Sequence, residues 1–151
     1  MFNKYNSIYN FQLDAAATTE NALCKSFFTL QDDALIKDWF PFKSIFLNPP
    51  YGRSIGKFIK KAYEESIKGC TVVCLVPARC DTLWWFNYAI KASEIIFITG
   101  RLKFINRSLP SYRLDGKFKL SSAPFPSCLI IFNGSNSTSL KISWKKSKDL
   151  L

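Results

Sequence analysis

Apolar runs that end in turn residues alternate with amphipathic stretches along most of the chain. The runs predict short strands at residues 11–13, 26–30, 44–47, 71–76, 94–99, 128–132 and 140–144. The run at 71–76 is almost continuously apolar, as expected of a central strand covered on both faces, and Pro77 ends it. Strands and helices that take turns in this way indicate an α/β fold.

Three stretches predict helices. From residue 54 to residue 67 apolar side chains recur at helical spacing, lysines and glutamates occupy the other face, and Gly69 ends the helix. Shorter helices are expected over residues 18–25 and 83–92, because threonine or aspartate residues suited to capping stand at or just before the start of each.

The net charge of the chain says more about its function than the chain length does. The 151 residues and the apolar fraction of 48% suit one core, so we expect residues 1–151 to form a single domain. Lysine and arginine number 21 and aspartate and glutamate 11, which gives a formal net charge of +10. This balance fits a nucleic acid partner, with an anionic membrane surface and a merely solvated surface as the alternatives.

The cysteines and the apolar runs bear on the compartment. Residues 1–10 carry no secretory signal, and the apolar runs are too short to span a bilayer, so we expect a soluble, cytoplasmic protein. The five cysteines form no C-x-x-C pair and the chain has no histidine, so zinc spacings are absent and no metal site is expected. Reduced, mostly buried thiols are the resulting expectation.

The sharpest chemical signal is Asn48-Pro49-Pro50-Tyr51, directly after the predicted strand 44–47. Ligands of open α/β sheets bind outside the carboxyl ends of the strands. The Asn48 side-chain oxygen and the Pro49 carbonyl can accept hydrogen bonds from a planar amine, which favours a pyramidal nitrogen and stabilises its developing charge during methylation. The prolines hold these acceptors, and Tyr51 offers a flat face to an extruded base. A proline-rich turn without function is the alternative.

A methyl donor for that motif is expected across the carboxyl ends of the first strands, where Asp14, Ala15 and Ala16 stand. Small side chains let a ligand approach the backbone, and Asp14 is suited to the cationic end of the donor. A helix start is the alternative interpretation of these residues. Asp33 follows the next predicted strand, where a carboxylate can accept hydrogen bonds from ribose hydroxyls or cap a helix.

Taken together, these segments resemble the phage-type DNA N-6-adenine methyltransferases. The resemblance rests on FQLDAAA at 11–17, ENALCK at 20–25, DDAL at 32–35, DW at 38–39, NPPY at 48–51, LVPA at 75–78 and GR at 100–101. It implies a Rossmann-like methyltransferase sheet with helices on both faces, S-adenosylmethionine as the methyl donor and double-stranded DNA as the substrate. It also implies that residues 48–51 bind the amine, and that Asp14 and Asp33 contact the donor.

The segment between residues 102 and 127 shows no convincing periodicity and carries three prolines. A loop of this length in a compact domain is usually functional or disordered. We expect residues 105–126 to contact DNA, because cations position phosphates and aromatic rings can fill the gap left by a flipped base. An unstructured surface loop is the alternative. The candidate DNA-binding side chains are Arg107, Arg113, Lys117 and Lys119.

One departure from the family pattern keeps other functions open. The family usually begins with a segment that contains a Trp-x-Thr-Pro motif and helps close the donor site, and residues 1–151 do not contain it. A misassigned start, a truncated prophage remnant that binds DNA without catalysis, and a divergent active form are the alternatives. A protein-glutamine amide methyltransferase is the enzymatic rival, although the net charge suits phosphates better.

Direct methyl transfer requires the amine to lie close to the donor. We therefore predict that the strand ending at Leu47 lies beside the strand ending at Leu13, and that Asn48 and Asp14 face one cleft.

Overall fold

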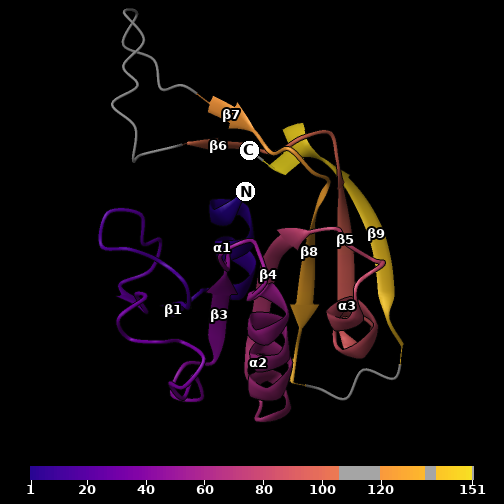
Figure 1. Cartoon of the computed structure of the whole chain (residues 1–151). Coiled ribbons are helices and arrows are strands. Elements are labelled where there is room, and N and C mark those ends of the chain that lie inside the picture. The colour runs from indigo at the N-terminus through magenta and orange to yellow at the C-terminus, as the bar shows by residue number, and fades with distance from the viewer. Residues whose placement is uncertain (106–119, 135–138, 151) are drawn as a thin grey trace, which may run out of the picture.

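A seven-stranded sheet in the order β2-β1-β3-β4-β8-β5-β9 runs through the computed structural model, which describes residues 1–105, 120–134 and 139–150 (Figure 1). Its strands are β1 (Leu13–Asp14), β2 (Ser26–Phe27), β3 (Ser44–Leu47), β4 (Thr71–Pro77), β5 (Glu94–Thr99), β8 (Ser127–Phe132) and β9 (Lys141–Lys146). Only β8 is antiparallel to its neighbours, and the other pairs are parallel. Strands β6 (Lys103–Ile105) and β7 (Leu120–Ser122) form a separate antiparallel pair.

Helical segments cover both faces of this sheet. They are α1 (Phe2–Tyr9), α2 (Ile55–Ile67), α3 (Leu83–Asn87), and the short 3-10 helices η1 (Ala89–Lys91) and η2 (Ser147–Leu150). Side chains of α2, α3 and η1 pack on one face, and those of α1 and η2 pack on the other. The expected Rossmann-like α/β fold with helices on both faces is confirmed. None of the described helices is long and apolar enough to cross a membrane.

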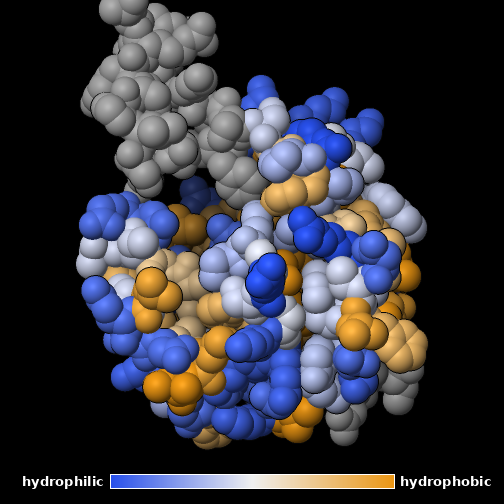
Figure 2. Space-filling model, in the orientation of Figure 1, coloured by the Kyte–Doolittle hydropathy of each residue, from blue (hydrophilic) through white to orange (hydrophobic). Residues whose placement is uncertain are grey.

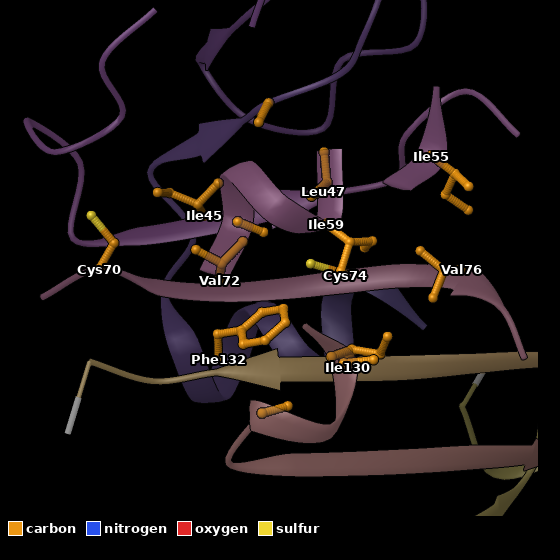
Figure 3. Close-up of a cluster of buried hydrophobic side chains, with 14 of the residues drawn as sticks. Ile45, Leu47, Ile55, Ile59, Cys70, Val72, Cys74, Val76, Ile130 and Phe132 are labelled. Carbon is orange, nitrogen blue, oxygen red and sulfur yellow. The ribbon is translucent and has the colours of Figure 1, made fainter. Parts of the chain in front are cut away.

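The larger core lies between the sheet and helices α2 and α3 (Figure 3). Ile59 of α2 packs among β-strand side chains such as Leu47, Val72 and Ile130, and all four are fully buried. Each such side chain contributes roughly 1.5–3 kcal/mol when it leaves water. Strand β4 has neighbours on both sides and buried residues on both faces, as its apolar run predicts.

Three predicted elements match the structure closely because their apolar patterns are typical of one kind of element only. The strands at Ser44–Leu47 and Glu94–Thr99 have the predicted bounds, and the predicted helix after residue 54 runs over Ile55–Ile67. The thiols are free, and Cys70, Cys74 and Cys128 among them are buried.

The helix predicted over residues 18–25 is wrong. The backbone makes a single turn there, in which Asn21 and Ala22 donate to the carbonyl of Thr18. The next amide, that of Leu23, donates instead to Asp14 Oδ2 at 3.1 Å, so the helix cannot continue. A hydrogen bond from nine residues away therefore overrides the local helical pattern.

Other elements differ in length. The predicted strand 26–30 is only two residues long, because the chain turns where Thr29 donates both its N–H and its hydroxyl to Asp32 Oδ2. The predicted helix 83–92 divides into α3 and η1 at Tyr88, whose backbone leaves the helical region and whose ring packs against Tyr63. Helix α1 was not predicted, since only Tyr5 of its residues is buried.

Candidate active site

The two predicted halves of the site meet where the sheet changes its winding direction. From β1 the chain moves to one side, to β2, and from β3 it moves to the other, to β4. Strands β1 and β3 are parallel neighbours, with Asp14 opposite Phe46, so the prediction that they lie side by side is confirmed. Such a switch point is the usual ligand site of an open α/β sheet. Figure 2 shows the surface hollowed beside these strand ends.

The motif Asn48-Pro49-Pro50-Tyr51 follows β3 at this point and turns the chain into α2. Pro49 is buried and Asn48 is half-buried, whereas Pro50 and Tyr51 are exposed. The Tyr51 hydroxyl donates a hydrogen bond to Asn48 Oδ1 at 2.9 Å. This bond orients the Asn48 amide, and since an amide oxygen has two lone pairs, Oδ1 keeps one acceptor position for a further donor.

Phe125 lies within the predicted DNA-contacting segment 105–126, but the sequence did not single it out as a site residue. Its ring meets that of Tyr51 edge to face, with centroids 5.2 Å apart. Burial raises the pKa of Tyr51, and Cys128 adds to the shift, so the hydroxyl stays protonated and keeps donating to Asn48. The only signal in the sequence is an aromatic residue between two prolines, directly before the strand at Ser127–Phe132.

Asp14 lies at the end of β1 and is 3% exposed. Its carboxylate accepts the N–H of Leu23 at 3.1 Å and, more weakly, that of Ala16 at 3.5 Å. Burial raises the pKa of Asp14 above its usual value of 3.8, while these two hydrogen bonds lower it. Burial and the nearby Asp14 raise the pKa of Cys24 to about 11. Asp14 therefore orders the segment between β1 and β2.

The residues after Asp14 continue the sheet without side-chain bulk. Ala15 is buried and donates its N–H to the carbonyl of Phe46, and Ala16 is half-buried. Ala17 donates to the carbonyl of Phe28. The backbone after β1 is thus held between its two neighbouring strands, and small side chains leave it open to close approach by a ligand.

Asp33 lies in the turn after β2 and has a left-handed backbone with φ of 51°. Its side chain is exposed, and Oδ1 accepts the N–H of Leu35 at 3.2 Å. Within the described part of the chain no further donor binds this carboxylate, and its remaining lone pairs suit hydroxyl donors. Asp32, one residue earlier, is engaged by the Thr29 amide and hydroxyl, which lower its pKa.

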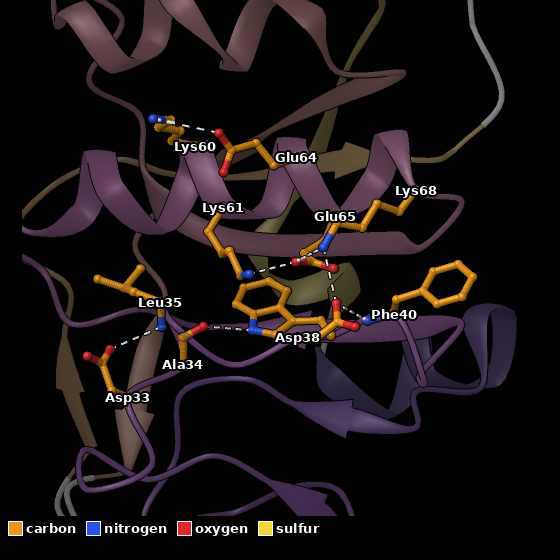
Figure 4. Close-up of polar contacts among 11 residues, drawn as sticks. Asp33, Ala34, Leu35, Asp38, Phe40, Lys60, Lys61, Glu64, Glu65 and Lys68 are labelled. Atoms are coloured by element: carbon orange, nitrogen blue, oxygen red, sulfur yellow. Dashed lines mark hydrogen bonds and ion pairs between the residues drawn. The ribbon is translucent and has the colours of Figure 1, made fainter.

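The turn that carries Asp33 is tied to helix α2 (Figure 4). The fully buried Trp39 donates its Nε1–H to the carbonyl of Ala34 at 2.8 Å. Lys68 lies 3.1 Å from Asp38 and 2.9 Å from Glu65, and so joins this segment to the helix. Glu65 is fully buried, and Lys61 also binds it, at 2.6 Å. Helix α2 follows the Asn48 motif directly, so the two halves of the site share one support.

Sequence comparison identifies the family of this site. The model of the DNA N-6-adenine-methyltransferase (Dam) family matches residues 1–151. The chain belongs to the Dam family. A DNA N-6-adenine-methyltransferase of Escherichia phage T1 is 37% identical to it over 92 residues, which are 61% of this chain. The chain spans 38% of the length of that relative.

The predicted DNA-contacting segment of this Dam family member is only partly within the described residues. Strand β6 ends at Ile105, where the segment begins, and β7 lies within the segment and pairs with β6. Its four candidate side chains, Arg107, Arg113, Lys117 and Lys119, lie outside the described residues, so their role stays a prediction.

Proposed function

We propose that the chain transfers a methyl group from S-adenosylmethionine to the exocyclic amine of adenine in double-stranded DNA. The observation that carries this proposal is the pairing of β1 with β3, by which Asp14 and the Asn48 motif follow adjacent strand ends at the switch point of the sheet. Membership of the Dam family supports the same reaction.

The Asn48 motif supplies the acceptors that an aromatic amine needs. The lone pair of the amine is delocalised into the ring, so it is a poor nucleophile until its protons are held by acceptors. Asn48 Oδ1 and the Pro49 carbonyl are those acceptors in our proposal. The Tyr51 hydroxyl, 2.9 Å from Oδ1, points that oxygen toward the base and lessens its freedom to rotate.

The aromatic pair beside Asn48 suits a flipped base. An adenine taken out of the duplex loses its stacking energy, and aromatic side chains in the enzyme restore part of it. Tyr51 is 36% exposed and offers a face to the base, while its edge-to-face contact with Phe125 restrains the tilt of the Tyr51 ring.

Asp14, Ala15, Ala16 and Asp33 fit the donor by their chemistry. When bound, the donor would supply an electrophilic methyl group. The amine nitrogen would bond to the methyl carbon as the sulfur–methyl bond breaks, S-adenosylhomocysteine would leave, and the amine proton would pass to solvent. Asp14 suits the ammonium of the methionine part, directly or through the backbone of the segment that it orders. The exposed Asp33 carboxylate suits the ribose hydroxyls. Ala15 and Ala16 let the donor approach the backbone.

A methyl-transfer assay tests this function against its rivals. The chain is incubated with radiolabelled S-adenosylmethionine and either duplex DNA or a protein extract, and Asn48→Ala is compared with Asn87→Ala, an exposed asparagine at the end of α3. We expect label in DNA as N6-methyladenine, lost in Asn48→Ala only. Label on protein glutamine instead would support the amide methyltransferase, and DNA binding without donor binding would support the non-catalytic remnant.

A further inference from the structure

The far edge of the sheet, away from the switch point, carries an exposed aromatic and cationic surface that the proposed reaction does not use. Among the described strands, β9 ends the sheet and pairs only with β5. We define the β9 edge surface as the exposed aromatic and cationic residues at the carboxyl ends of β5 and β9, which are Arg101, Trp144, Lys145, Lys146 and Lys148.

Trp144 is exposed but held in a fixed orientation. It is 63% exposed, and its ring stacks on Phe97 with centroids 5.7 Å apart and an interplanar angle of 25°. Phe97 stacks in turn on Trp85 of α3 at 6.1 Å. A large aromatic ring presented to solvent and packed from behind is a suitable contact surface for sugars or bases.

The positive charge of the β9 edge surface is not neutralised within the protein. Among the residues that the structure describes, no carboxylate lies within ion-pair distance of Arg101, Lys145, Lys146 or Lys148, and Asp149 is the only acidic residue in their two segments. Lys141, at the other end of β9, is paired with Glu94 at 3.4 Å. The unpaired cations therefore gather at the carboxyl end of the strand.

The strand register places this surface level with the Asn48 motif. Leu47 pairs with Cys74, so the Asn48 motif leaves β3 three residues before β4 ends at Pro77. From there the pairs across the sheet are Pro77 with Ser127, Ser127 with Ile98, and Ile98 with Lys145. Lys145 and the Asn48 motif thus both lie at the carboxyl ends of the parallel strands, which form the upper side of the sheet in Figure 1.

The distance from β3 to β9 across the carboxyl ends of the strands corresponds to a short run of base pairs in DNA. Four strand spacings separate β3 from β9, and at about 4.8 Å each they span about 19 Å. A length of about 19 Å corresponds to the rise of roughly five to six base pairs. Arg53 and Arg79 are exposed after β3 and β4 on the way, with Asp81 as the acidic residue among them.

We propose that the β9 edge surface binds the phosphate backbone of duplex DNA about five to six base pairs from the target adenine. This inference rests on DNA being the substrate. The lysines and Arg101 neutralise phosphates, and Trp144, which shares a face of β9 with Lys146, packs against an adjacent sugar. The edge is a poor site for strand pairing with a second copy, because exposed lysines on an edge strand disfavour such pairing.

DNA affinity across a salt series tests the proposal. The variant Lys145→Ala/Lys146→Ala is compared with the wild type and with Lys60→Ala/Lys91→Ala, which removes two exposed lysines on α2 and before β5. For a duplex of about 20 base pairs, the first variant should lower affinity roughly tenfold at about 0.15 M salt and reduce the log–log salt slope by about 1.8. The control variant should change neither, and matching thermal midpoints show that all three are folded.

Two outcomes would overturn the proposed DNA contact of the β9 edge surface and leave the proposed methylation reaction unaffected. One is an unchanged affinity and slope in Lys145→Ala/Lys146→Ala while the wild type binds and methylates DNA. The other is a dimer in sedimentation that these substitutions abolish with DNA affinity unchanged, which assigns the edge to a second copy. A wild type that binds no DNA would instead remove the proposed function and this inference together.

The spacing has its own measurement. Once the methylated adenine has been mapped in a long duplex, substrates are shortened on each side of it to about three or about eight base pairs. The wild type should lose DNA affinity when one particular flank is short, and Lys145→Ala/Lys146→Ala should be insensitive to that flank. Equal sensitivity of both proteins contradicts the placement of the surface.

Discussion

The middle of the sheet and its β1–β2 end are built by different means. Strands β4 and β8 are seven and six residues long and almost wholly buried. Strands β1 and β2 have two residues each, and the segments between β1 and β3 form no helix. Those segments depend on side chains that bind backbone groups, as Asp14 binds the Leu23 amide and Trp39 the Ala34 carbonyl.

This difference separates stability from chemistry. Apolar burial is non-directional and scales with area, so the middle strands supply stability without placing any one atom accurately. Hydrogen bonds between side chains and backbone are directional and contribute less each, but they set positions. We therefore expect substitutions in the middle of the sheet to change the free energy of unfolding, and those at the β1–β3 end to change ligand affinity and turnover.

The largest effect should come from Phe132→Ala in β8. Phe132 is 2% exposed, and truncation of a buried phenylalanine lowers the free energy of unfolding by about 3–5 kcal/mol. Urea unfolding measures this change. Phe86→Ala, at a residue 69% exposed on α3, should change it by less than about 0.5 kcal/mol. A large loss of turnover per folded molecule in Phe132→Ala would contradict the proposed separation of stability from chemistry.

Asn48→Ala should show the reverse pattern. We expect kcat to fall at least about a hundredfold, the scale for removal of one transition-state partner, with little change in donor affinity or thermal midpoint. Tyr51→Phe keeps the ring and loses only the hydroxyl bond to Asn48, so its kcat should fall less, roughly tenfold. Single-turnover methylation and calorimetric donor binding measure the two quantities. Near-normal kcat in Asn48→Ala would refute the amine-activation role.

Trp39→Phe should have an intermediate effect, on the free energy of unfolding and on donor affinity. The substitution keeps an aromatic ring but leaves the Ala34 carbonyl without its Nε1–H donor, which should cost about 1–2 kcal/mol of stability. The Asp33 turn lies beside Ala34, so donor affinity should weaken severalfold while kcat at saturating donor stays the same. Calorimetry tests this, with Trp84→Phe as the matched control. Equal donor affinity in both variants would show that the turn does not support the donor.

The smallest effect is a pH dependence from Asp14. Its pKa is raised in the folded state, so the folded protein binds the proton more tightly than the unfolded chain. The stability it contributes is fully present below about 3.8 and is lost as pH rises through the folded pKa. Urea unfolding at several pH values should therefore show the difference between wild type and Asp14→Asn falling as pH rises.

Asp32→Asn is the control of opposite sign. Hydrogen bonds from Thr29 lower the pKa of Asp32, so its contribution is present above about 3.8 and is lost as pH falls through the folded pKa. The same direction of change in both variants would contradict the account of Asp14 as a carboxyl governed by burial.

The sequence predicted best where one physical term dominates. The helix at Ile55–Ile67 and the strands at Ser44–Leu47 and Glu94–Thr99 follow from apolar patterns alone. The pairing of β1 with β3, which puts Asp14 and the Asn48 motif at adjacent strand ends, followed from the general rule for ligand sites in α/β sheets.

It failed where a distant partner decides. Asp14 takes the Leu23 amide and prevents the expected helix over residues 18–25. Phe125 meets Tyr51 only because β8 enters the sheet beside β4, which no local pattern reveals. The ion pairs by which Lys68 joins Asp38 to Glu65 of α2 could not be predicted for the same reason.

The position of β8 has a consequence for synthesis on the ribosome. This strand lies between β4 and β5, yet the chain makes it after both of them. Until residue 132 has left the exit tunnel, the nascent chain holds two apolar strands whose facing edges have no partner. Premature termination before β8 should therefore yield aggregates rather than a smaller soluble domain, and translation speed through residues 127–132 should influence the yield of folded protein.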